Sequence, residues 1–573
     1  MNASLSTNTA ARTSTSALPL SQNIKLYKFH GGVHPPFHKK DSNQKPIEFA
    51  GIPERLIVPI HQHIGKTAEL VVSVGDTVKK GQLIAEKSDF ISAAIHAPTS
   101  GKISFIGEHS IPHPSGLTEI CAVIDTDGKD NWGDYKLTPI EDPTNADSSK
   151  LLDRIEQAGI VGLGGAVFPT SVKLAGASNQ NKSKIKTLII NGAECEPYIT
   201  CDDRLMQDRS ADIVKGIQVI QTLIKPENCQ IAIEDNKPEA IAAMRAATAD
   251  ISDIEVIAIP TIYPSGGEKQ LIEILTGKEV RSGGLPIELG LMCSNVGTTY
   301  SIYKAIYLGE PLLSRIITVT GNGIQHPQNF EVLIGTPFSH LAQQAGGYTK
   351  MAENLIMGGP MMGFAIPDDD VPVIKATNCA LFISATSLRE SNPAFSNQPT
   401  LPCIRCGKCM EVCPVKLLPQ QLYWHIRAKD FEKAEDHSLR DCIDCGCCSY
   451  VCPSHIPLVD YFRFGKSEIR EQKVALEKAD LSRQRHEFLL YRKERDKRER
   501  DEKRAAHKAA LQEKKAAAKP NGASGEQSSS PKADAIKAAM ERAKAKKQAR
   551  TESEQSDAKS SKTDTKANTE EAQ

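Results

Sequence analysis

Eight cysteines in two short runs constrain this chain more than any other feature of its 573 residues. The first run is LPCIRCGKCMEVCP (401–414), and the second is DCIDCGCCSYVCPSH (441–455). Both contain the spacing C-x2-C-x2-C-x3-C, and in both a proline follows the fourth cysteine. Three thiols at this spacing surround one face of an iron–sulfur cubane, and a fourth before proline is directed at the other cluster of a pair. The runs therefore predict two [4Fe–4S] clusters.

The spacing also divides the eight thiols between the two clusters. One cluster takes Cys403, Cys406, Cys409 and Cys452, and the other takes Cys413, Cys442, Cys445 and Cys448. Cys447 falls outside the spacing, and we interpret it as a bystander thiol. Structural zinc, the main alternative, favours two close cysteine pairs separated by a longer loop. Because the segment between the runs has a helix-like pattern, we expect a helical twin-cluster ferredoxin domain over residues 395–465.

Composition limits the remaining function classes. Lys and Arg number 70, as do Asp and Glu, and a net charge of zero gives no support to nucleic acid as a partner. No window approaches eighteen uninterrupted apolar residues, so we predict no membrane-spanning helix. Residues 1–23 lack the basic start and apolar run of a secretory signal, and we expect a disordered leader there. The fifteen cysteines therefore indicate a reducing compartment and metal binding rather than disulfides.

A short segment after this leader is rich in Gly, Pro and His. It reads FHGGVHPPFHKKDS (29–42) and places His30, His34 and His38 four residues apart. A helix would bring the three imidazoles to one face, as a metal site requires. Its glycines and prolines make a helix improbable, so we favour an ordered loop.

Residues 24–130 contain short β-rich runs between turn signals such as Gly75-Asp76 and Ser100-Gly101. This pattern resembles the biotinyl/lipoyl-type hairpin sandwich. In that family the modified lysine follows an aspartate in a turn, whereas here Phe90 follows Asp89. Since phenylalanine cannot carry a lipoyl arm, we expect a structural domain used for docking or packing.

Residues 150–310 alternate predicted strands and helices. TLIINGAE (187–194) and IEVIAIPT (254–261) read as buried strands, and IVKGIQVIQTLI (213–224) and PEAIAAMRAAT (238–248) read as helices. Such alternation predicts a parallel α/β domain. The chain as a whole is thus an α/β multidomain protein.

Three segments of this region place glycines or carboxylates at predicted strand ends: GIVGLGGAVFPTSVK (159–173), NGAECEP (191–197) and YPSGGEKQ (263–270). Ligands of α/β sheets bind outside the carboxyl ends of the strands. A glycine loop leaves backbone N–H groups open to a phosphate or a flat ring. The residues that we single out are Gly162, Gly164, Gly165, Glu194, Glu196 and Glu268.

The same region resembles the flavin- and NADH-binding subunit of respiratory complex I. The glycine loop of that family reads G-L-R-G-R-G-G-A-G-F-P-T-G-L-K, and it is matched here by Gly162, Gly164, Gly165, Phe168, Pro169, Thr170 and Lys173. Val161 and Leu163 replace the two family arginines. The family segment N-A-D-E-S-E-P matches residues 191–197, and Asn-Asn-Val-Glu-Thr matches residues 294–298.

The resemblance implies FMN and NADH as ligands and gives roles to single residues. Asn191 and Glu194 would face the isoalloxazine, and Glu196 would help to hold NADH. Lys173 would offset the negative charge of FMN, Asn295 would donate a hydrogen bond to it, and Thr298 would lie near its phosphate. Glu194, Glu196 and Glu268 would orient the nicotinamide or the ribose. Residues 311–385 resemble the ubiquitin-like module of the same family, a β-grasp domain of the SLBB type.

The order of modules over residues 24–465 resembles the C subunit of the Rnf-type ion-translocating NADH:ferredoxin oxidoreductase. This implies a peripheral electron-input subunit on the cytoplasmic side of the cell inner membrane, held there by integral membrane subunits. Electrons would pass from NADH through FMN and both clusters to ferredoxin or another low-potential acceptor. A flavin is needed because NADH gives up two electrons at once, whereas a cluster accepts one.

Two alternatives remain open. The chain could be a soluble NADH-dependent flavoprotein that reduces a free carrier, or a relay scaffold without flavin, which the changes at Val161 and Leu163 keep open. Residues 466–573 are highly charged, and we expect a solvated helix, a Gly/Ser-rich break, a second Ala/Lys-rich helix and a disordered end.

Overall fold

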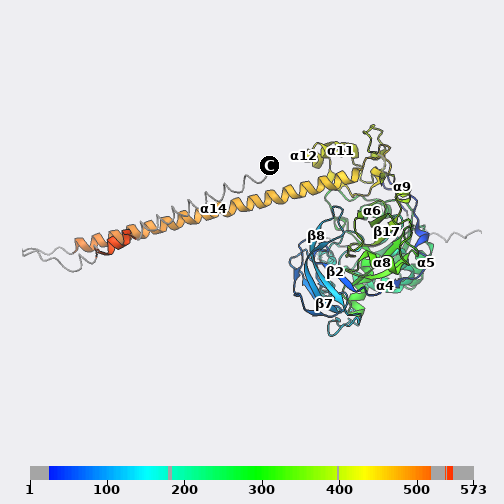
Figure 1. Cartoon of the computed structure of the whole chain (residues 1–573), viewed down its shortest axis with the longest axis horizontal. Coiled ribbons are helices and arrows are strands. Elements are labelled where there is room, and N and C mark those ends of the chain that lie inside the picture. The colour runs from blue at the N-terminus through cyan, green and yellow to red at the C-terminus, as the bar shows by residue number, and fades with distance from the viewer. Residues whose placement is uncertain (1–24, 179–183, 396–398, 518–535, 537, 546–573) are drawn as a thin grey trace, which may run out of the picture. The chain divides into compact units, whose positions relative to one another are not determined.

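The computed structural model describes residues 25–178, 184–395, 399–517, 536 and 538–545. The chain divides into two compact units, Met1–Val474 and Ala475–Gln573. The predicted disordered leader, the Gly/Ser-rich break and the C-terminal end lie outside the described residues, as does part of the second predicted helix of the tail. Figure 1 shows the elements of both units by label and colour.

The N-terminal domain consists of two small antiparallel sheets. One has the strand order β2-β8-β7-β4 (Arg55–Pro59, Thr118–Thr126, Gly101–Ser110, Thr77–Val78), and the other has β3-β5-β6 (Glu69–Leu70, Leu83–Glu86, Ile95–His96). Their inner faces share one apolar core that includes Leu56, Ile84 and Ile103, all fully buried. Phe90 lies on the loop between β5 and β6 and is 68% exposed. This is the hairpin sandwich that the turn signals predict, with β2, β7 and β8 visible in blue in Figure 1.

The following domain is built on a parallel sheet of order β11-β10-β9-β12 (Ile254–Ile259, Asn228–Glu234, Thr187–Gly192, Leu291–Asn295). Its helices are α1 (Ser148–Gln157), α2 (Thr170–Ser178), α3 (Cys201–Asp208), α4 (Ser210–Ile224), α5 (Pro238–Ala247), α6 (Glu268–Thr276) and α7 (Val296–Tyr303). The predicted strands and helices of this region are confirmed to within a few residues. The carboxyl ends of β9, β11 and β12 thus meet at one edge of the sheet, where residues 191–197, 263–270 and 295–298 adjoin them. The prediction that the glycine loop also follows a strand is wrong, because this loop joins α1 to α2.

A third sheet has the order β1-β14-β13-β17-β15-β16 (Glu48–Phe49, Gln328–Leu333, Ser314–Thr320, Cys379–Ile383, Asn354–Met357, Phe364–Ile366). Helix α8 (Phe338–Gln344) packs on it through Phe338, Leu341 and Ala342. Strand β1 lies within residues 24–130, the range predicted to form the N-terminal domain, but it pairs in parallel with β14 of this third sheet. The β-rich module therefore includes a strand distant in sequence, which the sequence analysis did not predict. Helix α9 (Ala385–Ser391) follows β17.

The cysteine region is helical, as predicted. Its helices are α10 (Lys408–Glu411), α11 (Pro419–Arg427), α12 (Phe431–Asp436), α13 (Cys447–Tyr450) and the start of α14 (Leu458–Ala516). Leu422, Ile426 and Phe462 form the centre of its small core. Helix α14 runs on through residue 465, where the sequence analysis ended this domain. Gly465 lies at that position but does not cap the helix: it is buried inside α14, where a Cβ would come within 3.0 Å of the Ile426 side chain. Among the helices that the structure describes, none combines the length and apolar character needed to cross a bilayer.

The His/Pro-rich segment (residues 29–42) is an ordered loop, as predicted, with one short helical turn, η1 (Lys39–Asp41). Its histidines do not converge. His30 Nδ1 lies 2.9 Å from the carbonyl oxygen of Cys413, whereas the His38 ring stacks on Tyr198 with centroids 4.5 Å apart. The segment therefore links the cysteine region to the loop after β9.

Candidate functional site

The glycine loop packs against the N-terminus of α7. A Cβ at Gly164 would come within 3.1 Å of the Asn295 Cβ, and the amide of Leu163 donates to Thr298 Oγ1 at 2.8 Å. Gly164 and Gly165 are exposed, and a Cβ at Gly165 would meet nothing within 4 Å. The loop thus offers an open backbone face that a flat ring or a phosphate fits.

The other polar residues of this edge form a connected network. Asn295 accepts from the amides of Gly297 and Thr298 through Oδ1, and its Nδ2 donates to Asp202 Oδ2 at 2.7 Å. Asn191, at the end of β9, donates from Nδ2 to the Gly266 carbonyl at 2.9 Å, and Lys173 of the segment 159–173 pairs with Glu268. The structure therefore brings together the three segments that the sequence analysis selected.

Lys173 on α2 and Glu268 at the start of α6 form an ion pair of 2.8 Å that is partly open to solvent. Burial is the largest single effect on the pKa of Lys173 and lowers it, but the charge of Glu268, the nearby Cys293 and the hydrogen bond to Glu268 together raise this pKa above its usual value. Lys173 is thus a fixed cation beside the glycine loop. The carboxylate of Glu268 is engaged with this lysine.

The two glutamates after β9 are also engaged. The Glu194 carboxylate accepts from the Asp202 amide at 2.8 Å and from Cys201 Sγ at 3.3 Å, which caps α3. The Glu196 carboxylate accepts from the amides of Met361 and Met362 at 2.7 and 3.0 Å. Burial raises the pKa of Glu196 against these donors, and its Oε2 has no partner among the described residues. Glu196 thus ties the α/β domain to the β-rich module.

Three charged residues that the sequence analysis missed support this edge. Lys39 Nζ donates to the carbonyls of Glu194, Glu196 and Ile199 at 2.6, 2.8 and 2.6 Å. Lys237, fully buried, donates to Glu194 O at 3.3 Å and pairs with Glu234. Burial, assisted by Glu194, raises the pKa of Asp202 to about 7. Lys39 lies in the His/Pro-rich segment. The two lysines of that segment were the only sequence signal that it holds the carbonyls after β9.

The first cysteine run forms an open cavity of about 310 Å³. Its lining includes Cys403, Cys406, Cys409 and, from the second run, Cys452. Cys406 is exposed, and Cys403, Cys409 and Cys452 are half-buried. This group of four is the one that the spacing assigns to one cluster.

The second run closes around a much smaller cavity of about 20 Å³. Four of its lining residues are Cys413, Cys442, Cys445 and Cys448, the other assigned group. Cys447 also lines it and is fully buried, so burial does not separate this thiol from the four. Burial raises the pKa of Cys409 to about 11 and that of Cys448 well above its usual range, so that metal must displace protons from these thiols.

The separation of the sulfur atoms bears on the zinc alternative. Zinc–sulfur bonds of about 2.3 Å in a tetrahedron put ligand sulfurs about 3.8 Å apart. In the described part of the chain, only Glu194, Cys201 and Asp202 bring three candidate donor atoms within 4.8 Å of one another. No three cysteines of the two runs therefore have sulfurs as close together as that. The cysteines of both runs are more widely spaced, which fits a cubane better than a single zinc ion.

The α/β domain contacts the second cysteine group directly. Tyr263 is fully buried, and its hydroxyl donates to the Cys445 carbonyl at 2.6 Å. Tyr263 exchanges two backbone hydrogen bonds with Val33 of the His/Pro-rich segment, at 2.8 and 3.0 Å. Cys195, from the loop after β9, packs into the same apolar cluster as Tyr263, Met361 and Cys447. The two candidate cofactor regions therefore share a buried and largely apolar boundary.

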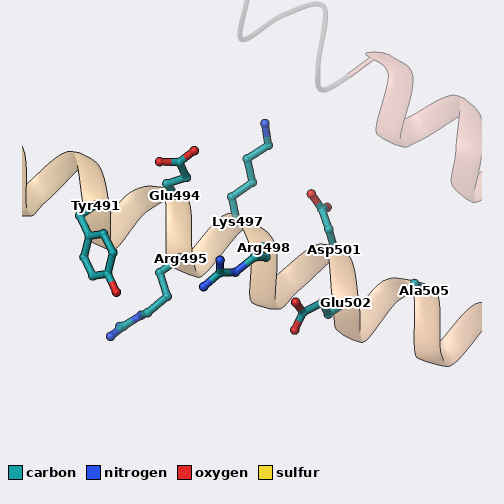
Figure 2. Close-up of a pocket in the computed structure, with 8 residues that line it drawn as sticks. All are labelled: Tyr491, Glu494, Arg495, Lys497, Arg498, Asp501, Glu502 and Ala505. Atoms are coloured by element: carbon teal, nitrogen blue, oxygen red, sulfur yellow. The ribbon is translucent and has the colours of Figure 1, made fainter.

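A further concavity of about 520 Å³ lies along α14 in the second unit. Figure 2 shows that Tyr491 and Arg495 project to one side of the helix and that Glu494, Lys497 and Asp501 project to the other. Its lining comes from one helix only, with charges of both signs. It offers no wall to enclose a ligand, and we do not treat it as a candidate site.

Four family models match successive parts of the chain. They are the RnfC Barrel sandwich hybrid domain (27–129), the Nuo51 FMN-binding domain (155–304), the SLBB domain (316–365) and the 4Fe-4S dicluster domain (402–456). These matches confirm the predicted fold class. They also confirm FMN and iron–sulfur clusters as the cofactors, each at the level of its domain.

Relatives named as C subunits of the ion-translocating oxidoreductase complex match most of the chain. That of Pectobacterium atrosepticum is 45% identical over 534 residues, which cover 92% of this chain and 72% of the relative. That of Pseudomonas aeruginosa is 49% identical, and the match covers 84% of this chain and 60% of the relative. That of Pasteurella multocida is 47% identical, and the match covers 80% of this chain and 54% of the relative. The chain thus spans little more than half the length of the last two.

Domains for FMN and for two [4Fe–4S] clusters on one chain define an iron–sulfur flavoprotein of the electron-transfer class. Identity and coverage define the family more closely. The chain belongs to the family of ion-translocating oxidoreductase complex C subunits, which confirms the resemblance of its module order.

Proposed function

We propose that this chain is the peripheral electron-input subunit of a membrane-bound complex that couples electron transfer between NADH and ferredoxin, or another low-potential acceptor, to ion translocation. Electrons pass from NADH through FMN and then through both [4Fe–4S] clusters. The observation that carries the proposal is the buried hydrogen bond from Tyr263 to the Cys445 carbonyl. It joins the FMN-binding domain to a cluster site without intervening solvent.

Six residues of the glycine-loop side are proposed to hold FMN. The open face at Gly162, Gly164 and Gly165 accommodates the ring or the phosphate, since side chains there would block it. Lys173 supplies positive charge beside this loop. Asn295 and Thr298 belong to the N-terminus of α7, where an anion is favoured.

Asn191 and three carboxylates are proposed to position the flavin and NADH. Asn191 is held by the Gly266 carbonyl, and Glu194 by the N-terminus of α3, so both are rigid at the strand end. Glu196 and Glu268 are held by amides and by a lysine. Their contribution is to orient the ligands rather than to transfer protons, because hydride transfer depends mainly on positioning. When bound, FMN supplies the conversion of a two-electron donor into single electrons.

The eight cysteines of the two runs are proposed as the cluster ligands, in the two groups of four that line the two cavities. Membrane attachment is proposed to come from integral membrane subunits of the same complex, on the cytoplasmic side of the cell inner membrane. The exposed Phe90 loop of the N-terminal domain is one surface available to such a partner.

The test is anaerobic purification of the chain with iron, sulfide and flavin measured on the same sample, followed by addition of NADH. We expect about eight irons and one FMN per chain, with loss of cluster absorbance on adding NADH. A full iron content without flavin and without a response to NADH would contradict the proposal and favour the relay scaffold. A chain with all cofactors and a response to NADH, but no affinity for membranes that carry the other subunits, would favour the soluble flavoprotein.

A further inference from the structure

The two cysteine cavities differ in what covers them. The cavity of Cys413, Cys442, Cys445 and Cys448 lies against the α/β domain. The Tyr263 hydroxyl reaches Cys445, and the amide of Gly32 donates to the Val412 carbonyl at 3.0 Å. Contact there is close: a Cβ at Gly446 would lie 2.6 Å from the Met361 carbonyl oxygen. This cluster site faces the flavin side and leaves no room for another protein.

The other cavity, lined by Cys403, Cys406, Cys409 and Cys452, opens to solvent. Around it stand large apolar side chains that are exposed, with Ile404 at 67% and Trp424 at 39%. Isolated exposed apolar residues need no explanation, but a group of them at the mouth of a redox site is the composition of a docking surface. Electrons that enter beside Tyr263 would leave here.

The charge of this rim indicates what docks on it. The charged residues that line the cavity are Arg405 and Lys408, both cationic and exposed. A third cation, Arg427, lies with its guanidinium 5.7 Å from the Trp424 ring centroid. Cationic rims steer anionic partners and raise their association rates.

We propose that electrons leave the chain at the cluster of Cys403, Cys406, Cys409 and Cys452, and that its rim of Ile404, Arg405, Lys408 and Trp424 docks a redox protein with an acidic face around a one-electron centre. In each encounter the reduced cluster loses one electron, the partner's centre gains it, and no bond or proton changes hands. The inference rests on the proposed function for the source of the electrons. The docking itself does not depend on NADH.

Another role for the rim cations must be separated from docking. A [4Fe–4S] cluster with four thiolates is anionic, so Arg405 and Lys408 could serve only to balance its charge and raise its reduction potential. Charge balance would affect every oxidant alike, whereas docking affects a charged protein partner. The experiment therefore compares two oxidants on the same reduced protein.

The full-length holoprotein is reduced with dithionite, freed of excess reductant and mixed with oxidised ferredoxin of acidic surface, or with neutral benzoquinone as reference. Reoxidation is followed by cluster absorbance over a series of ionic strengths. The variants are Arg405→Glu/Lys408→Glu and Trp424→Ala. The control is Lys102→Glu/Lys150→Glu, which makes the same change in charge at exposed lysines of other domains. Calorimetric titration of each protein with the same ferredoxin measures binding directly.

For the rim charge variant we expect the ferredoxin rate, divided by the benzoquinone rate, to fall about tenfold or more at low salt and to lose its salt dependence. Trp424→Ala weakens binding at every ionic strength, and the control double variant behaves as the wild type. Equal losses with both oxidants, or equal losses in the rim and control variants, would overturn the proposal. A wild-type protein that ferredoxin reoxidises but NADH does not reduce would contradict the proposed function and leave the docking surface standing.

Discussion

The two cysteine runs have nearly the same backbone and very different surroundings. Positive φ angles recur at matched positions, with Arg405 and Asp444 at 56° and 54° and Gly407 and Gly446 at 83° and 80°. Yet a Cβ added at Gly407 would meet nothing within 4 Å, whereas one at Gly446 would collide with the Met361 carbonyl. The same cysteine spacing thus gives the same local backbone in both runs, whereas contacts with other domains determine what lies next to each run.

The surroundings also differ in their ties to the α/β domain. The second run is tied to the α/β domain by Tyr263, which donates to the Cys445 carbonyl at 2.6 Å. Within the cysteine region it is also held by Lys466 on α14, whose Nζ donates to the Cys442 carbonyl at 2.6 Å and to Asp444 at 2.8 Å. The rim of the first run carries exposed apolar and cationic side chains instead. These surroundings are those that an entry site and an exit site need, which are the roles proposed above for the two runs.

The largest effect is expected from alanine at the two matched glycines. Gly407→Ala and Gly446→Ala both force a side chain into the left-handed region, which costs about 1 kcal/mol each. Gly446→Ala also places Cβ 2.6 Å from the Met361 oxygen, and such overpacking adds about 1–3 kcal/mol. The urea midpoint for loss of cluster absorbance should therefore fall much further for Gly446→Ala.

Because the backbone strain is common to both variants, the difference between them isolates the contact with the β-rich module. Equal shifts in the two midpoints would mean that the second cluster site is not held against Met361. The two cluster sites would then not differ in their contacts with the β-rich module.

Tyr263→Phe should give the next largest effect. It removes the hydroxyl that donates to the buried Cys445 carbonyl, and a buried acceptor left without a partner costs about 1–3 kcal/mol. Stopped-flow measurement should show slower reduction of the clusters by NADH, with little change in their reduction by dithionite. Tyr135→Phe, at an exposed tyrosine of the N-terminal part, is the control. Equal slowing with both reductants would point to general damage to the cluster domain.

Iron removal should distinguish the two sites by exposure. With an anaerobic chelator we expect two phases of about four irons each, because the open site yields its iron without local unfolding. Alkylation after the fast phase, followed by peptide mapping, should label Cys403, Cys406, Cys409 and Cys452 first. The labelling also tests whether the fourth ligand of each cluster comes from the other run. If it does, Cys413 should react in the slow phase, with Cys442, Cys445 and Cys448. A single phase, or early labelling of Cys413 in place of Cys452, would contradict the assignment.

Short-range features could be predicted from the sequence in physical terms. Three ligands of each proposed cluster lie within a few residues of one another, and the C-x2-C-x2-C-x3-C spacing assigns the fourth to the other run. The strand at 187–192 is evident from its continuous apolar run. The turn signals of residues 24–130 were enough to predict the hairpin sandwich. In each case the signal and the structure lie in the same segment.

Contacts between distant segments could not be predicted in this way. Lys39 holds carbonyls more than 150 positions away, and Glu196 reaches the amides of Met361 and Met362. No periodicity records such pairings, because they depend on how the domains pack. The same holds for Gly465, which the sequence analysis took as the end of the cluster domain but which packs inside α14 against Ile426 and Leu439. Sequence reasoning thus identified the candidate residues at the strand ends but not the groups that restrain them.

The smallest effect is expected at the exposed edge of the buried site. Lys416, after the first run, pairs with Glu279 of the α/β domain, but both side chains are more than half exposed. Exposed ion pairs contribute at most about 1 kcal/mol and are screened by salt. Lys416→Ala should therefore shift the urea midpoint slightly at low ionic strength and not at all at high ionic strength, with Glu279→Ala and the double variant completing the cycle. A coupling free energy that persists at high salt would mean that water is excluded from this edge. Water would then be excluded from the whole boundary between the FMN-binding domain and the second cysteine group, and not only from its centre at Tyr263.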